Sequence, residues 1–424
     1  MLCIAGSTAF AQQTPGKAQT EPITIKGATA HIGNGTVIEN SVLIFENGII
    51  TAIGGSETPV KGQVIDAQGH HVYPGFIAPC KPLGLIEIDA VRATKDEDEI
   101  GSLIPNMRSL IAYNAESTVV ETARPNGVLL AQATPQGGRI SGTSSIVQLD
   151  AWNWEDAAVK IDDGIHLNWP SSFSRGRWWL GEPRGLHPNK EYSEQMDEVK
   201  VFIKNARAYG KTEPKTQNEA FKAMQGLFDG SKKLYIHVQG EKEIIDAVTT
   251  AKNLDVQEIV VVGGYDAYKI IPFLKENKIP VLVRHTHSLP MKDDDDYDMP
   301  YKLPKLLTEG GLLVGLQNED AALFQTRNLP FYAGQVAGQG MDKEEALKLI
   351  TSNTAKILGI DARYGTLETG KSATLFISEG DALDIPSNHL SHAFIDGREI
   401  SLKTHQTELW KRYSGKYGHD IGER

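Results

Sequence analysis

The stretch that decides the fold runs over residues 234–284 and reads LYIHVQGEKEIIDAVTTAKNLDVQEIVVVGGYDAYKIIPFLKENKIPVLVR. It holds three short apolar runs separated by two amphipathic stretches: Leu234–Val238, Glu241–Lys252, Glu258–Val262, Tyr268–Asn277 and Pro280–Arg284. Continuous apolar runs of this length are typical of strands buried on both faces, and the stretches between them predict helices. The pattern therefore predicts an α/β fold with a parallel sheet covered by helices.

The same alternation extends outward in both directions. Further apolar runs lie at Gly127–Ala133, Ser145–Leu149 and Leu312–Leu316, and Lys302–Thr308 is a further helical stretch. About eight such units fit a closed (β/α)8 TIM-like barrel, whose active site gathers at the C-terminal ends of the strands. An open doubly wound sheet is the alternative, and it is weakened because no dinucleotide-type glycine fingerprint follows an early strand.

Both ends of the chain are rich in predicted strands. Two apolar runs flank Asn47-Gly48, a pair that tolerates the positive φ values of a tight hairpin turn. Near the other end, Ala373–Ile377 and Ala393–Ile400 also predict strands. We expect one composite β-sandwich domain built from both termini. The expected division is a signal-peptide remnant and linker at 1–20, a first β part at 21–73, the barrel at 74–364, a second β part at 365–403 and a tail at 404–424.

The composition excludes several classes of protein. The 424 residues carry 43 Lys and Arg against 54 Asp and Glu, a formal charge of −11, and 40% are hydrophobic. These are globular values, and an acidic chain does not suit a nucleic-acid groove. No run is long and apolar enough to predict a membrane span. Two cysteines, Cys3 and Cys80, exclude a disulfide scaffold.

The first eleven residues, MLCIAGSTAFA, suggest export. Ala9-Phe10-Ala11 has the small-x-small form of a signal-peptidase site, although the apolar stretch before it is short and has no basic start. We expect an exported, periplasmic protein whose signal peptide is truncated in the gene model. A frayed N-terminal tail is the alternative.

Two segments resemble those of a known family. Val64–Ile77, which ends in Tyr-Pro-Gly-Phe-Ile, is similar to the "PGFIDxHxH" segment that enters the first barrel strand of the amidohydrolase superfamily. Thr351–Gly359 and Tyr364–Ala373 are similar to the family's C-terminal segment, and the resemblance is closest to the imidazolonepropionase-like branch. It implies a TIM barrel and hydrolysis of carbon–nitrogen bonds other than peptide bonds. It also implies one or two divalent metals that activate water.

The first-strand positions depart from this resemblance. Where the family has two histidines one residue apart, this chain has Cys80 and Pro82. A cysteine thiolate can bind zinc, but proline offers no ligand atom. Lys81 between them brings a positive charge to the barrel mouth, and this charge opposes a bound cation.

The other positions implied by the resemblance are mixed. His237 matches the fifth-strand metal ligand, whereas Gly263 stands at the position of the sixth-strand histidine. The eighth-strand acid that orients or deprotonates water falls on Asn318 by register, and Asp320 is close enough to replace it. We therefore expect Asp320, with Asn318, to hold the catalytic position.

A second histidine pair can compensate for the lost ligands. His285 and His287 follow an apolar run at the expected active-site edge, and with His237 they would form a three-histidine site for one divalent metal, zinc by preference. The alternative is a loop whose histidines hydrogen-bond the acidic stretch Asp293–Asp298. For His166, another strand-end residue, a partly buried, hydrogen-bonded ring is the better interpretation.

Two functional hypotheses follow from these residues. The first is a hydrolase of carbon–nitrogen (non-peptide) bonds that acts on a small-molecule substrate with an altered metal site. The second is a non-catalytic barrel that binds a small molecule or pairs with an intact homologue, so the partners considered are a second copy or a paralogous subunit. The loss of histidine at positions 80 and 82 is the strongest feature for the second hypothesis.

Overall fold

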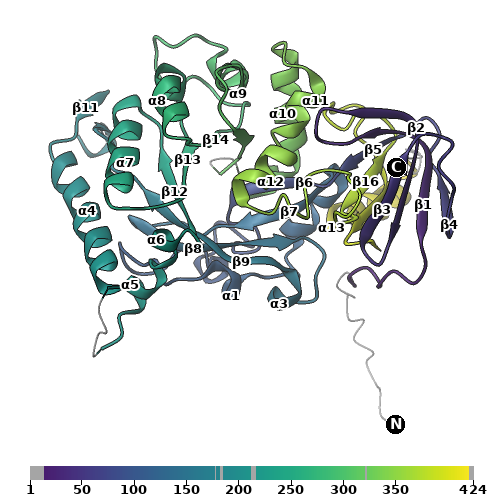
Figure 1. Cartoon of the computed structure of the whole chain (residues 1–424), viewed down its shortest axis with the longest axis horizontal. Helices are drawn as coiled ribbons and strands as arrows, with labels where there is room; N and C mark the ends of the chain where they lie inside the picture. Colours follow the sequence, from purple (N-terminus) through teal and green to yellow (C-terminus); the bar gives the residue numbers. More distant parts are fainter. Residues whose placement is uncertain (1–13, 177, 182–184, 212–215, 320–321, 420–424) are drawn as a thin grey trace.

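The computed structural model describes residues 14–176, 178–181, 185–211, 216–319 and 322–419 (Figure 1). Two sheets dominate it, an eight-stranded barrel sheet and an eight-stranded sheet made from the two ends of the chain. Strands from the purple and yellow ends of the chain lie together at one side of Figure 1, beside the barrel.

The barrel sheet contains the strands expected from the apolar runs. Its members are β6 (Phe76–Lys81), β7 (Val128–Ala133), β8 (Ile140–Gln148), β9 (Ala158–Asn168), β12 (Lys233–Val238), β13 (Ile259–Gly263), β14 (Val281–Val283) and β15 (Val314–Leu316). They follow one another in this order across the sheet. Between its outer strands, the carbonyls of Leu349 and Ile350 accept hydrogen bonds from the amides of Leu316 in β15 and Ile77 in β6. The predicted barrel is confirmed.

One strand departs from the repeating β–α pattern. β8 runs antiparallel to both β7 and β9, whereas the other neighbouring pairs of this sheet are parallel. Only residues 134–139 join β7 to β8, and Gly137 and Gly138 there have φ values of 80° and 58°. A connection this short turns the chain straight back, because a parallel return needs a dozen or more residues.

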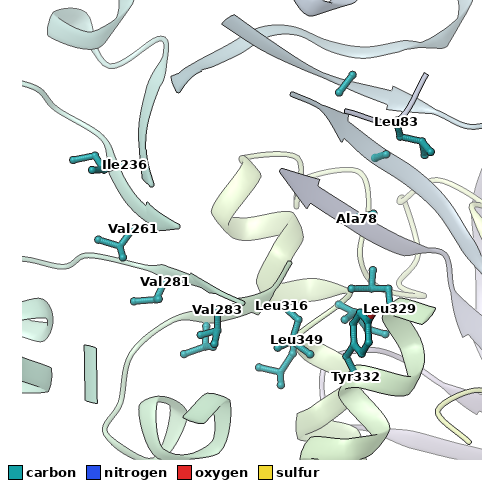
Figure 2. Packing of buried hydrophobic residues seen from close by; sticks show 14 of the residues in the cluster. Ala78, Leu83, Ile236, Val261, Val281, Val283, Leu316, Leu329, Tyr332 and Leu349 are labelled. Carbon is teal, nitrogen blue, oxygen red and sulfur yellow. The ribbon is translucent and has the colours of Figure 1, made fainter. Parts of the chain in front are cut away.

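Helices lie between the strands of the barrel sheet and after its last strand, and the final helix follows the β domain and buries none of its residues. They are α1 (Ser109–Ala112), α2 (Thr118–Glu121), α3 (Trp154–Ala157), α4 (Tyr192–Tyr209), α5 (Glu219–Ala223), α6 (Gly226–Asp229), α7 (Glu241–Asn253), α8 (Ile271–Glu276), α9 (Met299–Glu309), α10 (Leu329–Gly338), α11 (Lys343–Lys348), α12 (Ser352–Leu358) and α13 (His405–Tyr417). Figure 2 shows part of the resulting core, where Leu316 and Leu349 lie near Leu329 and Tyr332 of α10. Within the described ranges, none of these helices has the length and apolar character needed to cross a membrane.

The second sheet confirms the composite β domain. Its strands are β1 (Ile23–His31), β2 (Val37–Glu46), β3 (Ile49–Gly54), β4 (Gln63–Asp66), β5 (His71–Pro74), β16 (Leu375–Ser378), β17 (Leu390–Ile395) and β18 (Arg398–Glu399). Asn47 and Gly48 form the turn between β2 and β3 with φ values of 53° and 78°, as the pair predicts. A bridge between Ile49 and Ser372 brings the start of β3 back to the chain just before β16, so the sheet curls around its own core.

A buried carboxylate joins the β domain to the barrel. Asp150, only 2% exposed at its side chain, accepts a hydrogen bond of 2.8 Å from Arg124 and one of 3.2 Å from Arg398 of β18. The amide of Gly16 donates to the same carboxylate at 2.8 Å. Burial lowers the pKa of Arg124 and Asp150 opposes that shift, so the guanidinium depends on this carboxylate.

We expect Asp150→Ala to lower the free energy of unfolding by about 3–5 kcal/mol, because it leaves the buried Arg124 guanidinium without its carboxylate. Urea denaturation measures the change. Asp197→Ala is the control, since its ion pair with Lys200 is exposed at 3.3 Å and should contribute less than about 0.5 kcal/mol. Equal effects of the two substitutions would contradict this role of Asp150.

Candidate functional site

Three side chains form a hydrogen-bonded chain at the C-terminal ends of the barrel strands. Glu319 follows β15, His237 lies near the end of β12, and His166 lies near the end of the neighbouring β9. Glu319 Oε2 is 2.8 Å from His237 Nδ1, and His237 Nε2 is 2.8 Å from His166 Nδ1. Glu319 and His237 are partly accessible, with side chains 19% and 12% exposed, whereas His166 is fully buried. The solvent-accessible end of this hydrogen-bonded set of side chains is therefore the carboxylate of Glu319.

The hydrogen bonds define the tautomers of both rings. The Glu319 carboxylate accepts a hydrogen bond from His237 Nδ1–H, so His237 Nε2 accepts the hydrogen bond that His166 Nδ1–H donates. His166 Nε2 is then unprotonated and carries a lone pair, and this atom has no hydrogen-bond partner among the described groups. Burial, followed by the nearby His237, lowers the pKa of His166 well below its usual value. His166 is therefore a neutral ring that holds His237 in place.

A buried carboxylate supports this chain from inside the barrel. Asp163 of β9 accepts hydrogen bonds from Tyr235 at 2.7 Å, Gln132 at 2.9 Å and Ser144 at 2.7 Å. The ring of Tyr235 stacks on His166 with centroids 4.7 Å apart. Burial raises the pKa of Asp163, and its three hydrogen bonds act against that shift. The network fixes Tyr235, and through the stacked rings it fixes His166.

The end of β6 contributes a buried cation. Lys81 is 1% exposed, and its Nζ donates to the carbonyl oxygens of Asn318 at 2.7 Å and Glu319 at 3.4 Å. The Asn318 side chain donates to Gln325 O at 3.2 Å, and its catalytic role stays a prediction. The sequence expectation that Lys81 brings positive charge to the barrel mouth agrees with this position.

The other positions implied by the resemblance do not supply metal ligands. Cys80 is fully buried, donates its thiol toward Gln132 at 3.5 Å, and has a pKa raised mainly by burial, which opposes the thiolate that a metal requires. Gly263, with φ of 93°, leaves no room for a side chain, since a Cβ would lie 2.2 Å from Gln239 Nε2. These residues do not fit a divalent metal held in the usual way.

The structure separates the histidines predicted to form a three-histidine zinc site. His285 and His287 pack against Tyr332 of α10, with ring centroids 5.6 Å and 4.9 Å away, while His237 pairs with Glu319 and His166. In the part of the chain that is described, no three His, Cys, Asp or Glu side chains are grouped so that they could hold a metal ion. The geometry therefore gives the three-histidine site no support. Asp320 lies outside the described residues and stays a prediction.

The sequence singled out His237, as a metal ligand, but not Glu319. The register of the family resemblance assigned the eighth-strand role to residues 318 and 320, beyond the end of β15 at Leu316. His166 is hydrogen-bonded as predicted and is more deeply buried than expected, and its partner was not foreseen. Parallel pairing of Asn168 with His237 is what brings the ends of β9 and β12 together.

Comparisons with known proteins agree with this fold. Residues 308–405 match the model of the amidohydrolase family. The chain is 28% identical over 119 residues to an imidazolonepropionase from Syntrophobacter fumaroxidans (strain DSM 10017 / MPOB), a match that covers 28% of each protein. It thus spans little more than a quarter of the length of that curated relative.

Solved structures extend the similarity to most of the chain. An amidohydrolase from Thermotoga maritima MSB8 is 22% identical, with a TM-score of 0.78 over 89% of this chain and 99% of the other. A molinate hydrolase is 16% identical, with a TM-score of 0.55 over 92% of this chain and 95% of the other. Residues 308–405 thus resemble the amidohydrolase family, and the two solved structures share the fold of this chain.

We expect the stability of the protein to fall below about pH 6.5, because the unfolded chain protonates His166 where the folded chain does not. Because the pKa of His166 is lower in the folded than in the unfolded protein, the contribution of this residue to stability is complete above pH 6.5. It is lost as the pH falls. This one group therefore contributes to the loss of stability as the pH falls below about 6.5. Urea denaturation at both pH values should show a smaller loss for His166→Gln, and an identical loss would contradict the neutral, buried ring.

We expect the thiol of Cys80 to be inert toward a thiol reagent such as DTNB while the protein is folded, because it is buried and its pKa is raised. Cys3→Ser provides a background in which Cys80 is the one cysteine. Absorbance should develop only after denaturant is added. Rapid labelling of the native protein would place the thiol at an open barrel mouth instead.

Proposed function

We propose that this protein hydrolyses a carbon–nitrogen bond, other than a peptide bond, in a small amide or cyclic amide. The Glu319–His237 hydrogen bond is the single observation that carries the proposal, because it puts an oriented acid–base pair at the catalytic edge of the barrel. The imidazolonepropionase relative and the family match of residues 308–405 support the choice of bond.

The chemistry assigned to the pair is proton transfer. A water molecule gives a proton to the Glu319–His237 pair as its oxygen bonds to the substrate carbonyl carbon. The pair then returns that proton to the nitrogen as the carbon–nitrogen bond breaks. His166 keeps His237 in one orientation throughout, since its Nδ1 is hydrogen-bonded to His237 Nε2. Asp320, the acceptor predicted from sequence, is a second candidate for the same proton.

A second candidate function is binding without catalysis. Two observations favour it: the ammonium of Lys81 at the rim, and a cavity of about 470 Å³ whose lining includes His287, Phe331, Lys343 and Leu383. This volume suits a small organic molecule. In this case the barrel binds such a molecule or pairs with a second copy or an intact homologue.

We also propose export to the periplasm, on the Ala9-Phe10-Ala11 pattern.

We expect His237→Ala and Glu319→Gln each to lower kcat/KM by about 100-fold or more, because each removes one half of the acid–base pair. The substrates to test are imidazolonepropionate, molinate and simple lactams, with ring opening of the cyclic amides and amine release from molinate followed by chromatography. His392→Ala is the matched control: this histidine also pairs with a glutamate, Glu399 at 2.7 Å, but lies in the β domain.

Activity that is unchanged in both rim variants would contradict the assignment of the pair. Absence of turnover with every substrate, combined with saturable ligand binding in a thermal-shift assay, would favour the non-catalytic barrel.

A further inference from the structure

The buried ammonium of Lys81 is an unusual feature of this barrel rim. A charged side chain at 1% exposure loses most of its hydration, and this loss is costly unless protein groups replace the water. The carbonyls of Asn318 and Glu319 do so, at 2.7 Å and 3.4 Å. The chain therefore maintains a fixed positive charge at the edge where the active sites of such barrels lie.

An irregularity in β6 directs Lys81 to this position. The pairing of β6 with β7 shifts between Ala78 and Lys81, and Cys80 adopts a left-handed conformation with φ of 54°. Ile77 and Cys80 pack in the same interior cluster although they are three residues apart, so the regular alternation is broken between them. Strand alternation alone does not predict which way Lys81 points.

Lys81 joins two parts of the rim that the sheet does not pair directly. It lies at the end of β6, and its carbonyl partners directly follow β15, the strand at the other edge of the sheet. One of these partners, Glu319, is the residue whose carboxylate meets His237. The ammonium thus holds the backbone from which the Glu319–His237–His166 chain is built.

We propose that Lys81 is a positioning residue that replaces a bound divalent metal as the fixed cation of this rim. Its charge repels a second cation at the same place. Its hydrogen bonds also occupy carbonyl oxygens that would otherwise be available to an ion. The positioning role rests on the function proposed above, whereas the exclusion of metal does not.

The first test measures metal binding by the unmodified protein. The full chain is incubated with excess zinc, desalted, and its zinc content is measured. We expect clearly substoichiometric zinc, and Co²⁺ should leave the ¹⁵N signals of the His166 and His237 rings in place. About one zinc per chain that is lost in His237→Ala would overturn the proposal. This result does not depend on activity or on any Lys81 variant folding.

The second test uses Lys81→Met, which keeps the length of the side chain and removes its charge. We expect the His237 and His166 ring signals to shift and kcat to fall by about 10- to 100-fold with little change in KM. Lys305→Met is the matched control, because Lys305 also donates to a backbone carbonyl, Gln339 O at 3.1 Å, from helix α9. Ring signals in Lys81→Met that match those of the control would overturn the positioning role.

The two proposals fail in different ways. If no substrate is hydrolysed but zinc is excluded and the ring signals shift, the proposed hydrolysis fails and the role of Lys81 stands. If hydrolysis is found together with stoichiometric zinc at His237, the role of Lys81 fails and the hydrolase stands.

Discussion

The contact between the Lys81 ammonium and the carbonyls that follow β15 is the constraint on which the rim depends. The ends of β6 and β15 belong to opposite edges of the barrel sheet, and this contact links them. Glu319 extends from the linked backbone to His237, and His237 extends to His166. A cation supplied by a side chain has a fixed charge of one and a fixed covalent tether. A rim built on it is accordingly less adaptable than one built around an exchangeable ion.

The interior of the barrel explains why this rim can be rigid. Asp163 is saturated by three donors from three different strands, and one of them, Tyr235, stacks on His166. A buried carboxylate with a raised pKa is costly unless its donors are in place, so the network specifies one arrangement of these strands. The contacts of Asp163 that stabilise the barrel interior are thus connected, through Tyr235, to the contacts that orient His166 and His237 at the barrel mouth.

Much of the fold was predictable from the sequence because its signals are local. The run Leu234–Val238, the stretch Glu241–Lys252 and the Asn47-Gly48 turn each correspond to an observed element, since apolar periodicity and turn chemistry act over a few residues. The direction of β8 was not predictable in this way. An apolar run looks the same in parallel and antiparallel strands, and the short Gly137-Gly138 connection was the one signal for reversal.

The site was less predictable, because it depends on residues that local periodicity does not control. His237 lies inside a strand and was singled out as a metal ligand, whereas Glu319 lies beyond the end of β15 and Lys81 follows an irregularity in β6. His285 and His287 sit at the correct edge of the barrel but pack on Tyr332, a residue of α10 that no motif connects to them.

A crystal structure of the protein soaked in zinc, with anomalous diffraction recorded at the zinc edge, tests this account most directly. We expect Lys81 Nζ to stay on the carbonyls of Asn318 and Glu319, with no anomalous peak beside His237. A strong peak coordinated by His237, with the lysine displaced from the rim, would contradict it.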